Sequence, residues 1–99
     1  MSDVFSRFVG FQWDEGNSDK NLTKHNVQNW ESEQIFFNNP LLVLDDPKRS
    51  LVEQRWAAFG ITDAERLLVV VFTRRGKQIR VISARDMNRK EKKFYEENG

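Results

Sequence analysis

The sequence of 99 residues contains no cysteine and a single histidine, His25. Without cysteine the chain can form neither a disulfide nor a zinc site with sulfur ligands. One histidine leaves little for a metal cluster. The pair Asp45-Asp46 resembles half of a carboxylate metal site, but it precedes a proline and is more typical of a turn. We therefore expect neither a metal nor another cofactor.

The sequence also lacks long apolar stretches. Its longest uninterrupted run, Leu67–Phe72, has six residues, whereas a membrane-spanning helix needs about 20. Residues 1–5 do not combine a basic region with an apolar one, as a secretion signal does. No repeat, low-complexity tract or linker divides the chain. We expect a single cytoplasmic domain over residues 1–99, without membrane association.

Charge is distributed unevenly along the chain. Residues 74–95 contain nine Lys or Arg and two acids, whereas residues 1–73 contain seven basic and eleven acidic residues. The overall net charge of +1 conceals this segregation. A basic segment on an acidic body indicates a surface that faces a polyanion or an acidic protein partner, although a merely solvated face has the same composition.

The first half of the chain predicts one strand and two helices. Residues 7–13 alternate between polar and apolar side chains, as a short strand does, and the polar residues 14–26 favour a helix on the surface. A second helix is predicted from Asn29, as N-cap, to about Phe37, before Asn39-Pro40. Three tryptophans could stack on bases, but core packing is the simpler account of each: Trp13, Trp30 and Trp56.

The second half has the texture of a β-sheet. The segment 67–73 is apolar on both faces, which predicts a central strand covered on each side by a helix or a partner. Because the helices before it offer few aliphatic side chains, we expect a partner segment to dock on the sheet or its edge. Gly76 favours a tight turn into the next strand. Strands are predicted at 41–44, 53–62, 67–73 and 78–85.

The last element is predicted to be a helix from about Arg89 to Glu97. Asn88 and Glu91 have the spacing of a capping box, which would satisfy the first backbone N–H groups of this helix. The order of elements is then β-α-α-β-β-β-β-α. This order predicts an α+β fold in which helices flank a mainly antiparallel sheet.

Four blocks of the sequence carry a resemblance to a known family: residues 11–14 with 21–25, residues 35–37 with Pro40, residues 55–60, and residues 81–85 with Glu91 and Tyr95. Together they resemble the BrnT toxins, the ribonuclease components of bacterial type II toxin–antitoxin systems. The chain departs from the usual family pattern at Asn17, where Lys is common, and at Asn26, where Gly is common.

The resemblance implies a RelE-like fold and metal-independent RNA cleavage. It also implies neutralisation by a cognate BrnA-type antitoxin with a DNA-binding region. Toxin and antitoxin would form a hetero-oligomer that represses its own operon. A non-catalytic module, whose basic surface receives an acidic protein segment or nucleic acid, is the alternative from the residues themselves.

RNA cleavage without a metal needs cations that stabilise the charge on the phosphorane. Arg80 and Arg85 are the candidates, because a guanidinium is a planar fork that matches phosphate. In an ideal pleat Arg80 lies on the side of Ile82 and Ala84, and Arg85 emerges on the opposite side. A twist or bulge would be needed for both arginines to address one phosphate.

Cleavage also needs a base and an acid. His25 is the natural choice by its ordinary pKa, which the adjacent Lys24 would depress, although a lone histidine is often structural. Tyr95 could act as the acid or simply pack, and Glu91 could act as the base or simply cap its helix. The RNA backbone contacts are assigned to three basic residues: Lys24, Arg89 and Lys93.

Overall fold

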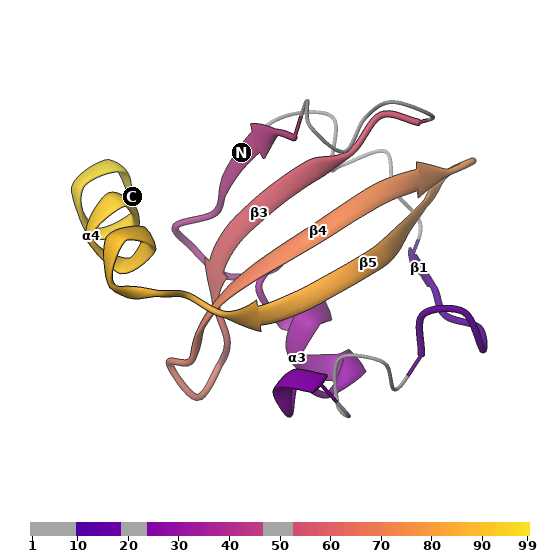
Figure 1. Cartoon of the computed structure of the whole chain (residues 1–99), viewed down its shortest axis with the longest axis horizontal. Coiled ribbons are helices and arrows are strands. Elements are labelled where there is room, and N and C mark those ends of the chain that lie inside the picture. Colours follow the sequence, from indigo (N-terminus) through magenta and orange to yellow (C-terminus); the bar gives the residue numbers. More distant parts are fainter. Residues whose placement is uncertain (1–9, 19–23, 47–52) are drawn as a thin grey trace.

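A five-stranded sheet of order β1-β5-β4-β3-β2 forms the centre of the computed structural model (Figure 1). The structure describes residues 10–18, 24–46 and 53–99. Among the described strands, β1 pairs with β5 in parallel and all other pairs are antiparallel. The predicted α+β fold is therefore confirmed, while the likeness to RelE stays a prediction. The elements are β1 (Gly10–Gln12), α3 (Asn29–Gln34), β2 (Leu42–Asp45), β3 (Trp56–Ile61), β4 (Leu67–Arg75), β5 (Gln78–Asp86) and α4 (Arg89–Asn98).

Strand β4 is central, as its sequence predicts, and the chain covers both of its faces. Leu68, Val70 and Phe72 pack with residues next to α3, whereas Val69 packs with residues of α4 on the other face. From Leu68 to Phe72 no side chain is more than 8% exposed. The premise that the chain lacks cover for this strand is therefore wrong, because residues next to α3 and residues of α4 pack on its two faces. Docking of a partner segment on the sheet or its edge stays a prediction.

The hairpin of β4 and β5 has an irregular register. Gly76 has a φ of +59° in the turn, as expected. Further along, Val71 pairs with Ser83 but the next residue, Phe72, pairs with Val81. Ile82 is thus an extra residue in β5, and such a bulge changes which side of the sheet the following side chains face.

The bulge decides the relation between the two candidate arginines. Val81 and Ala84 both belong to the core on the α3 side, although they are three residues apart. By alternation from these two residues, Arg80 and Arg85 both face the α4 side. The prediction that Arg80 shares a side with Ala84 is wrong, because the bulge at Ile82 reverses the alternation between them.

Helix α3 differs from its predicted bounds at both ends. Helix α3 has Gln28 as its N-cap in place of Asn29, with Glu31 completing a capping box, and it ends at Gln34. Trp30 is 56% exposed, so the expectation that it packs in the core is wrong. The other two tryptophans, Trp13 and Trp56, do pack against the core on the α3 side.

The predicted surface helix at 14–26 lies partly outside the described residues. Glu15–Ser18 form turns, and Lys24 and His25 are helical. Helix α4 begins at the predicted capping box of Asn88 and Glu91. No helix in the described part of the chain is long and apolar enough to cross a membrane.

Candidate functional site

A groove of about 330 Å³ opens on the α4 side of the sheet. Its apolar floor is formed by β3 and β4, which contribute Ala57, Phe59, Val69 and Val71. Polar residues of β5 and α4 form one wall: Ser83, Arg85 and Glu91. Asp45 and Asp46, at the end of β2, also line the groove. The groove therefore combines an apolar floor with carboxylates and with one cation, Arg85, that belongs to the predicted site.

Arg85 and Glu91 form a bidentate ion pair in this wall. Arg85 Nη1 donates to Glu91 Oε1 at 2.6 Å, and Nη2 donates to Oε2 at 2.8 Å. The Arg85 guanidinium is the main cause that lowers the pKa of Glu91, and Glu91 in turn raises the pKa of Arg85. Both groups are therefore charged at neutral pH, and the Glu91 carboxylate is a weak base.

The Arg85 guanidinium keeps one edge open. Nη1 also donates to the backbone carbonyl of Asp86, so contacts with described residues use three of the five N–H groups. The remaining two, on Nε and Nη2, form a second fork with the parallel geometry that phosphate oxygens accept. The Arg85 side chain is 42% exposed and lines the groove, so a ligand in the groove can contact this side chain.

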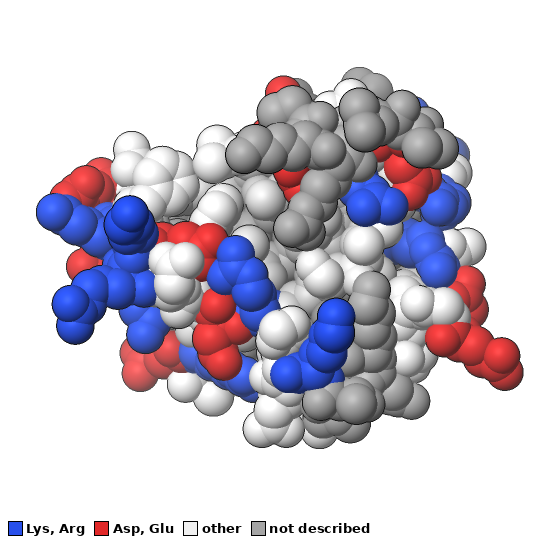
Figure 2. All heavy atoms as spheres, viewed as in Figure 1, with Lys and Arg blue, Asp and Glu red and all other residues white. Residues whose placement is uncertain are grey.

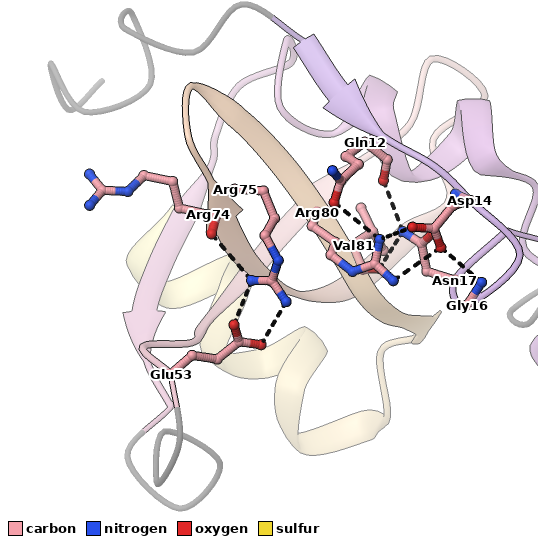
Figure 3. A network of polar contacts seen from close by, with 9 residues as sticks. All are labelled: Gln12, Asp14, Gly16, Asn17, Glu53, Arg74, Arg75, Arg80 and Val81. Carbon is pink, nitrogen blue, oxygen red and sulfur yellow. Dashed lines mark hydrogen bonds and ion pairs between the residues drawn. The ribbon is translucent and has the colours of Figure 1, made fainter.

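Arg80 lies on the same face of the sheet but is held at the β1 edge (Figure 3). Its guanidinium donates to both carboxylate oxygens of Asp14, at 2.8 and 3.1 Å, and to Gln12. The hydrogen bonds with Asp14 are the main cause that raises the pKa of Arg80. The Arg80 side chain is 17% exposed. Five residues of strand separate the Cα atoms of Arg80 and Arg85 by roughly 15 Å. The structure does not bring the two guanidinium groups together.

Asn17, where the family usually has Lys, has a structural position in the same network. Its side-chain amide donates to the carbonyls of Gln12 and Val81 and accepts from the backbone N–H of Asp14. It is 2% exposed. Asn17 therefore joins the turn after β1 to β5, and its buried, hydrogen-bonded side chain is not available for a phosphate contact.

Arg66, which the sequence did not indicate, joins several segments of the chain on the α3 side of the sheet. Its guanidinium forms a bidentate pair with Asp86, at 2.7 and 3.0 Å, and donates to Glu31 at 3.1 Å. It also donates to the backbone carbonyls of His25 and Asn26. Asp86 is the main cause that raises the pKa of Arg66. No sequence signal marks this residue, because its partners lie 20 to 41 positions away.

His25 and Lys24 lie beside this Arg66 cluster. Both side chains are exposed, and His25 adds to the lowering of the Asp86 pKa that Arg66 chiefly causes. Asp86 faces the α3 side because it pairs with Leu68, which belongs to that core. Neither His25 nor Lys24 lines the groove that contains Arg85. The structure therefore places His25, the candidate acid–base residue, and Arg85, the candidate for binding the scissile phosphate, on different faces of the sheet.

Tyr95 is 5% exposed and packs in the core under α4. Its hydroxyl donates to the carbonyl of Pro40 at 2.5 Å, and burial raises the pKa of this hydroxyl. The only proton of the group is thus committed to a backbone acceptor. This geometry favours the packing interpretation of Tyr95 over the catalytic one.

Helix α4 carries basic residues on its outer surface, where Lys and Arg gather (Figure 2). Arg89 and Lys93 are exposed and border a shallow depression together with Lys92 and Glu96. This arrangement suits contacts with a polyanion backbone. Among the described residues, no three His, Asp or Glu side chains are grouped so that they could hold a metal ion.

These features define a small α+β domain with one arginine of the sheet face presented in a groove beside a basic helix. The family model for the ribonuclease toxin BrnT, of type II toxin–antitoxin systems, matches residues 13–91 of the 99-residue chain. The chain therefore belongs to the BrnT family, as its sequence blocks indicated. An RNA substrate and an antitoxin partner follow from this membership. A comparison with curated proteins gave no match.

Proposed function

We propose that this BrnT toxin is a metal-independent endoribonuclease that binds the scissile phosphate in the groove through Arg85. The observation that carries the proposal is the open Nε–Nη2 fork of Arg85, in a groove with an apolar floor. A BrnA-type antitoxin with a DNA-binding region neutralises the toxin. We further propose that Arg89 and Lys93 of the adjacent helix contact neighbouring phosphates of the same strand.

In the proposed reaction the 2′-hydroxyl loses its proton, the 2′-oxygen attacks the phosphorus, the bond to the 5′-oxygen breaks, and the leaving 5′-oxygen gains a proton. The products are a 2′,3′-cyclic phosphate and a 5′-hydroxyl. Charge increases on the non-bridging oxygens in the phosphorane, and the Arg85 fork donates two hydrogen bonds to these oxygens. The guanidinium thereby supplies the charge stabilisation that a metal ion supplies in other nucleases.

His25 is kept as the candidate for this proton transfer on its side-chain chemistry alone, although it does not line the groove that contains Arg85. Because His25 lies next to Asp86 and away from the groove, this part of the proposal has a separate test. His25→Ala should lose about 10²–10⁴ in rate if His25 moves a proton. A variant with near-full activity and a lower melting temperature would instead identify His25 as structural.

The test of the Arg85 role compares Arg85→Ala with Arg75→Ala in RNA cleavage assays that contain EDTA. Arg75 is a matched control, because it is 41% exposed and paired with Glu53 on the same sheet, outside the groove (Figure 3). Loss of one charge-stabilising donor should cost about 10²–10³ in rate for Arg85→Ala. Arg75→Ala should cleave like the unaltered protein.

Two outcomes would count against this proposal. Cleavage that disappears in EDTA and returns with a divalent ion would contradict metal independence. Equal rates for Arg85→Ala and Arg75→Ala would remove Arg85 from the site. Ribosomes programmed with messenger RNA serve as a second substrate beside free single-stranded RNA, so that a requirement for ribosomes is not read as inactivity. Co-expression with a BrnA-type antitoxin should abolish cleavage.

A further inference from the structure

Glu91 connects the beginning of α4 to the guanidinium in the groove. Its Oε1 accepts from the backbone N–H of Asn88 at 2.8 Å and from Arg85 Nη1 at 2.6 Å. Its Oε2 accepts from Arg85 Nη2 at 2.8 Å. The Glu91 side chain is 19% exposed, less than half of the value for Arg85. One carboxylate thus serves both a helix cap and an ion pair.

These contacts determine the orientation of the Arg85 guanidinium. A bidentate pair brings the carboxylate and guanidinium planes into alignment, and Glu91 takes the edge formed by Nη1 and Nη2. The capping contact with Asn88 fixes the carboxylate in turn. The edge formed by Nε and Nη2 is therefore held in one direction before any ligand binds, which avoids an ordering cost in the transition state.

We propose that Glu91 is a positioning residue for RNA cleavage, which holds the open edge of Arg85 toward the phosphate and takes no proton from the substrate. This inference rests on the proposed role of Arg85. It differs from the interpretations of Glu91 as a general base or as a helix cap alone. The low pKa that Arg85 imposes on Glu91 agrees with it, because such a carboxylate is a weak proton acceptor near neutrality.

The test uses Glu91→Gln in the full-length protein with a fluorogenic single-stranded RNA of mixed sequence. The amide oxygen of glutamine can still accept from the Asn88 N–H, but the ion pair with Arg85 is lost. Glu53→Gln is the matched control, because Glu53 pairs bidentately with Arg75 away from the groove. Rates are measured as kcat and KM across pH, well below the melting temperature of every variant.

Positioning predicts a fall in kcat of about tenfold to a hundredfold for Glu91→Gln, smaller than the loss for Arg85→Ala. The shape of the pH–rate profile should stay that of the unaltered protein, and Glu53→Gln should leave kcat unchanged. In the Arg85→Ala background, Glu91→Gln should add little further loss, because the two residues act as a unit.

A second measurement does not depend on the stability of Glu91→Gln. Guanidinium ion should partly restore cleavage by Arg85→Ala, since the Glu91 carboxylate can hold the ion in place of the missing side chain. Restoration should be lost when Glu91→Gln is added. Equal restoration in both backgrounds, or loss of the acidic limb of the profile in Glu91→Gln, would overturn the inference. Equal activity of Arg85→Ala and the unaltered protein would instead refute the proposed function itself.

Discussion

Tyr95→Phe separates a structural tyrosine from a catalytic one. The substitution removes the hydroxyl that donates to the Pro40 carbonyl and keeps the aromatic ring in the core under α4. A hydrogen bond of this kind contributes about 0.5–1.5 kcal/mol, and a buried acceptor without its donor costs about 1–3 kcal/mol. Because Pro40 is only half-buried, water can reach this part of the chain, and we expect a loss of about 1 kcal/mol.

For a domain of this size, a loss of about 1 kcal/mol lowers the melting temperature by roughly 4–8 °C. Differential scanning calorimetry measures this change, and RNA cleavage is measured in parallel at a temperature where both proteins are folded. Cleavage should be unchanged, because the hydroxyl proton is already donated to a backbone carbonyl.

The opposite result would refute this reasoning. A general acid contributes about 10²–10⁴ to the rate. If Tyr95→Phe melted like the unaltered protein but lost activity by such a factor, the hydroxyl would have to leave Pro40 and act on the substrate. The packing interpretation of Tyr95 would then be wrong.

Three further predictions follow from the charged networks. Arg66→Ala should destabilise the protein by about 2 kcal/mol in urea unfolding, and more than Arg75→Ala, since it leaves the carboxylates of the Arg66 cluster unpaired. Asp86 and Glu91 have pKa values held below 3.8 and 4.5. Each charged carboxylate therefore stabilises the folded protein above its ordinary pKa, and this stabilisation is lost as the pH falls through the lower pKa of the folded state. The urea midpoint of unfolding should drop in acid, and it should drop less for Glu91→Gln. Lys93→Glu should reduce the slope of log K against log salt for single-stranded RNA by about 0.7, with the same bases cut; an unchanged slope would assign α4 to another partner.

Much of the fold was predictable because it depends on neighbours in the sequence. The apolar segment that became β4, the turn at Gly76 and the capping box of Asn88 and Glu91 each follow from side-chain periodicity or turn chemistry over a few residues. The resemblance to the BrnT family was likewise visible in the sequence, and the family match at residues 13–91 confirmed the family.

Other features were decided by contacts between distant residues. The bulge at Ile82 arises from the pairing of β4 with β5, and it alone turns Arg80 and Arg85 to one face. The partners of Arg66 lie up to 41 positions from it, so neither periodicity nor a motif indicates the cluster.

Glu91 has one role that the sequence predicts, the helix cap, and one that only the tertiary structure determines, the ion pair with Arg85. The spacing of Asn88 and Glu91 determined the helix cap, because a cap needs only the backbone N–H groups of one turn. That the same carboxylate grips Arg85 depends on how α4 folds back beside the end of β5. A helix can leave a strand in many directions, and here the packing of Tyr95 and Phe94 against Phe59 and Val69 selects one. Hydrophobic burial of α4 therefore determines that Glu91 pairs with Arg85. The pattern of side chains along the sequence does not predict this pairing, because it does not specify the direction of the helix.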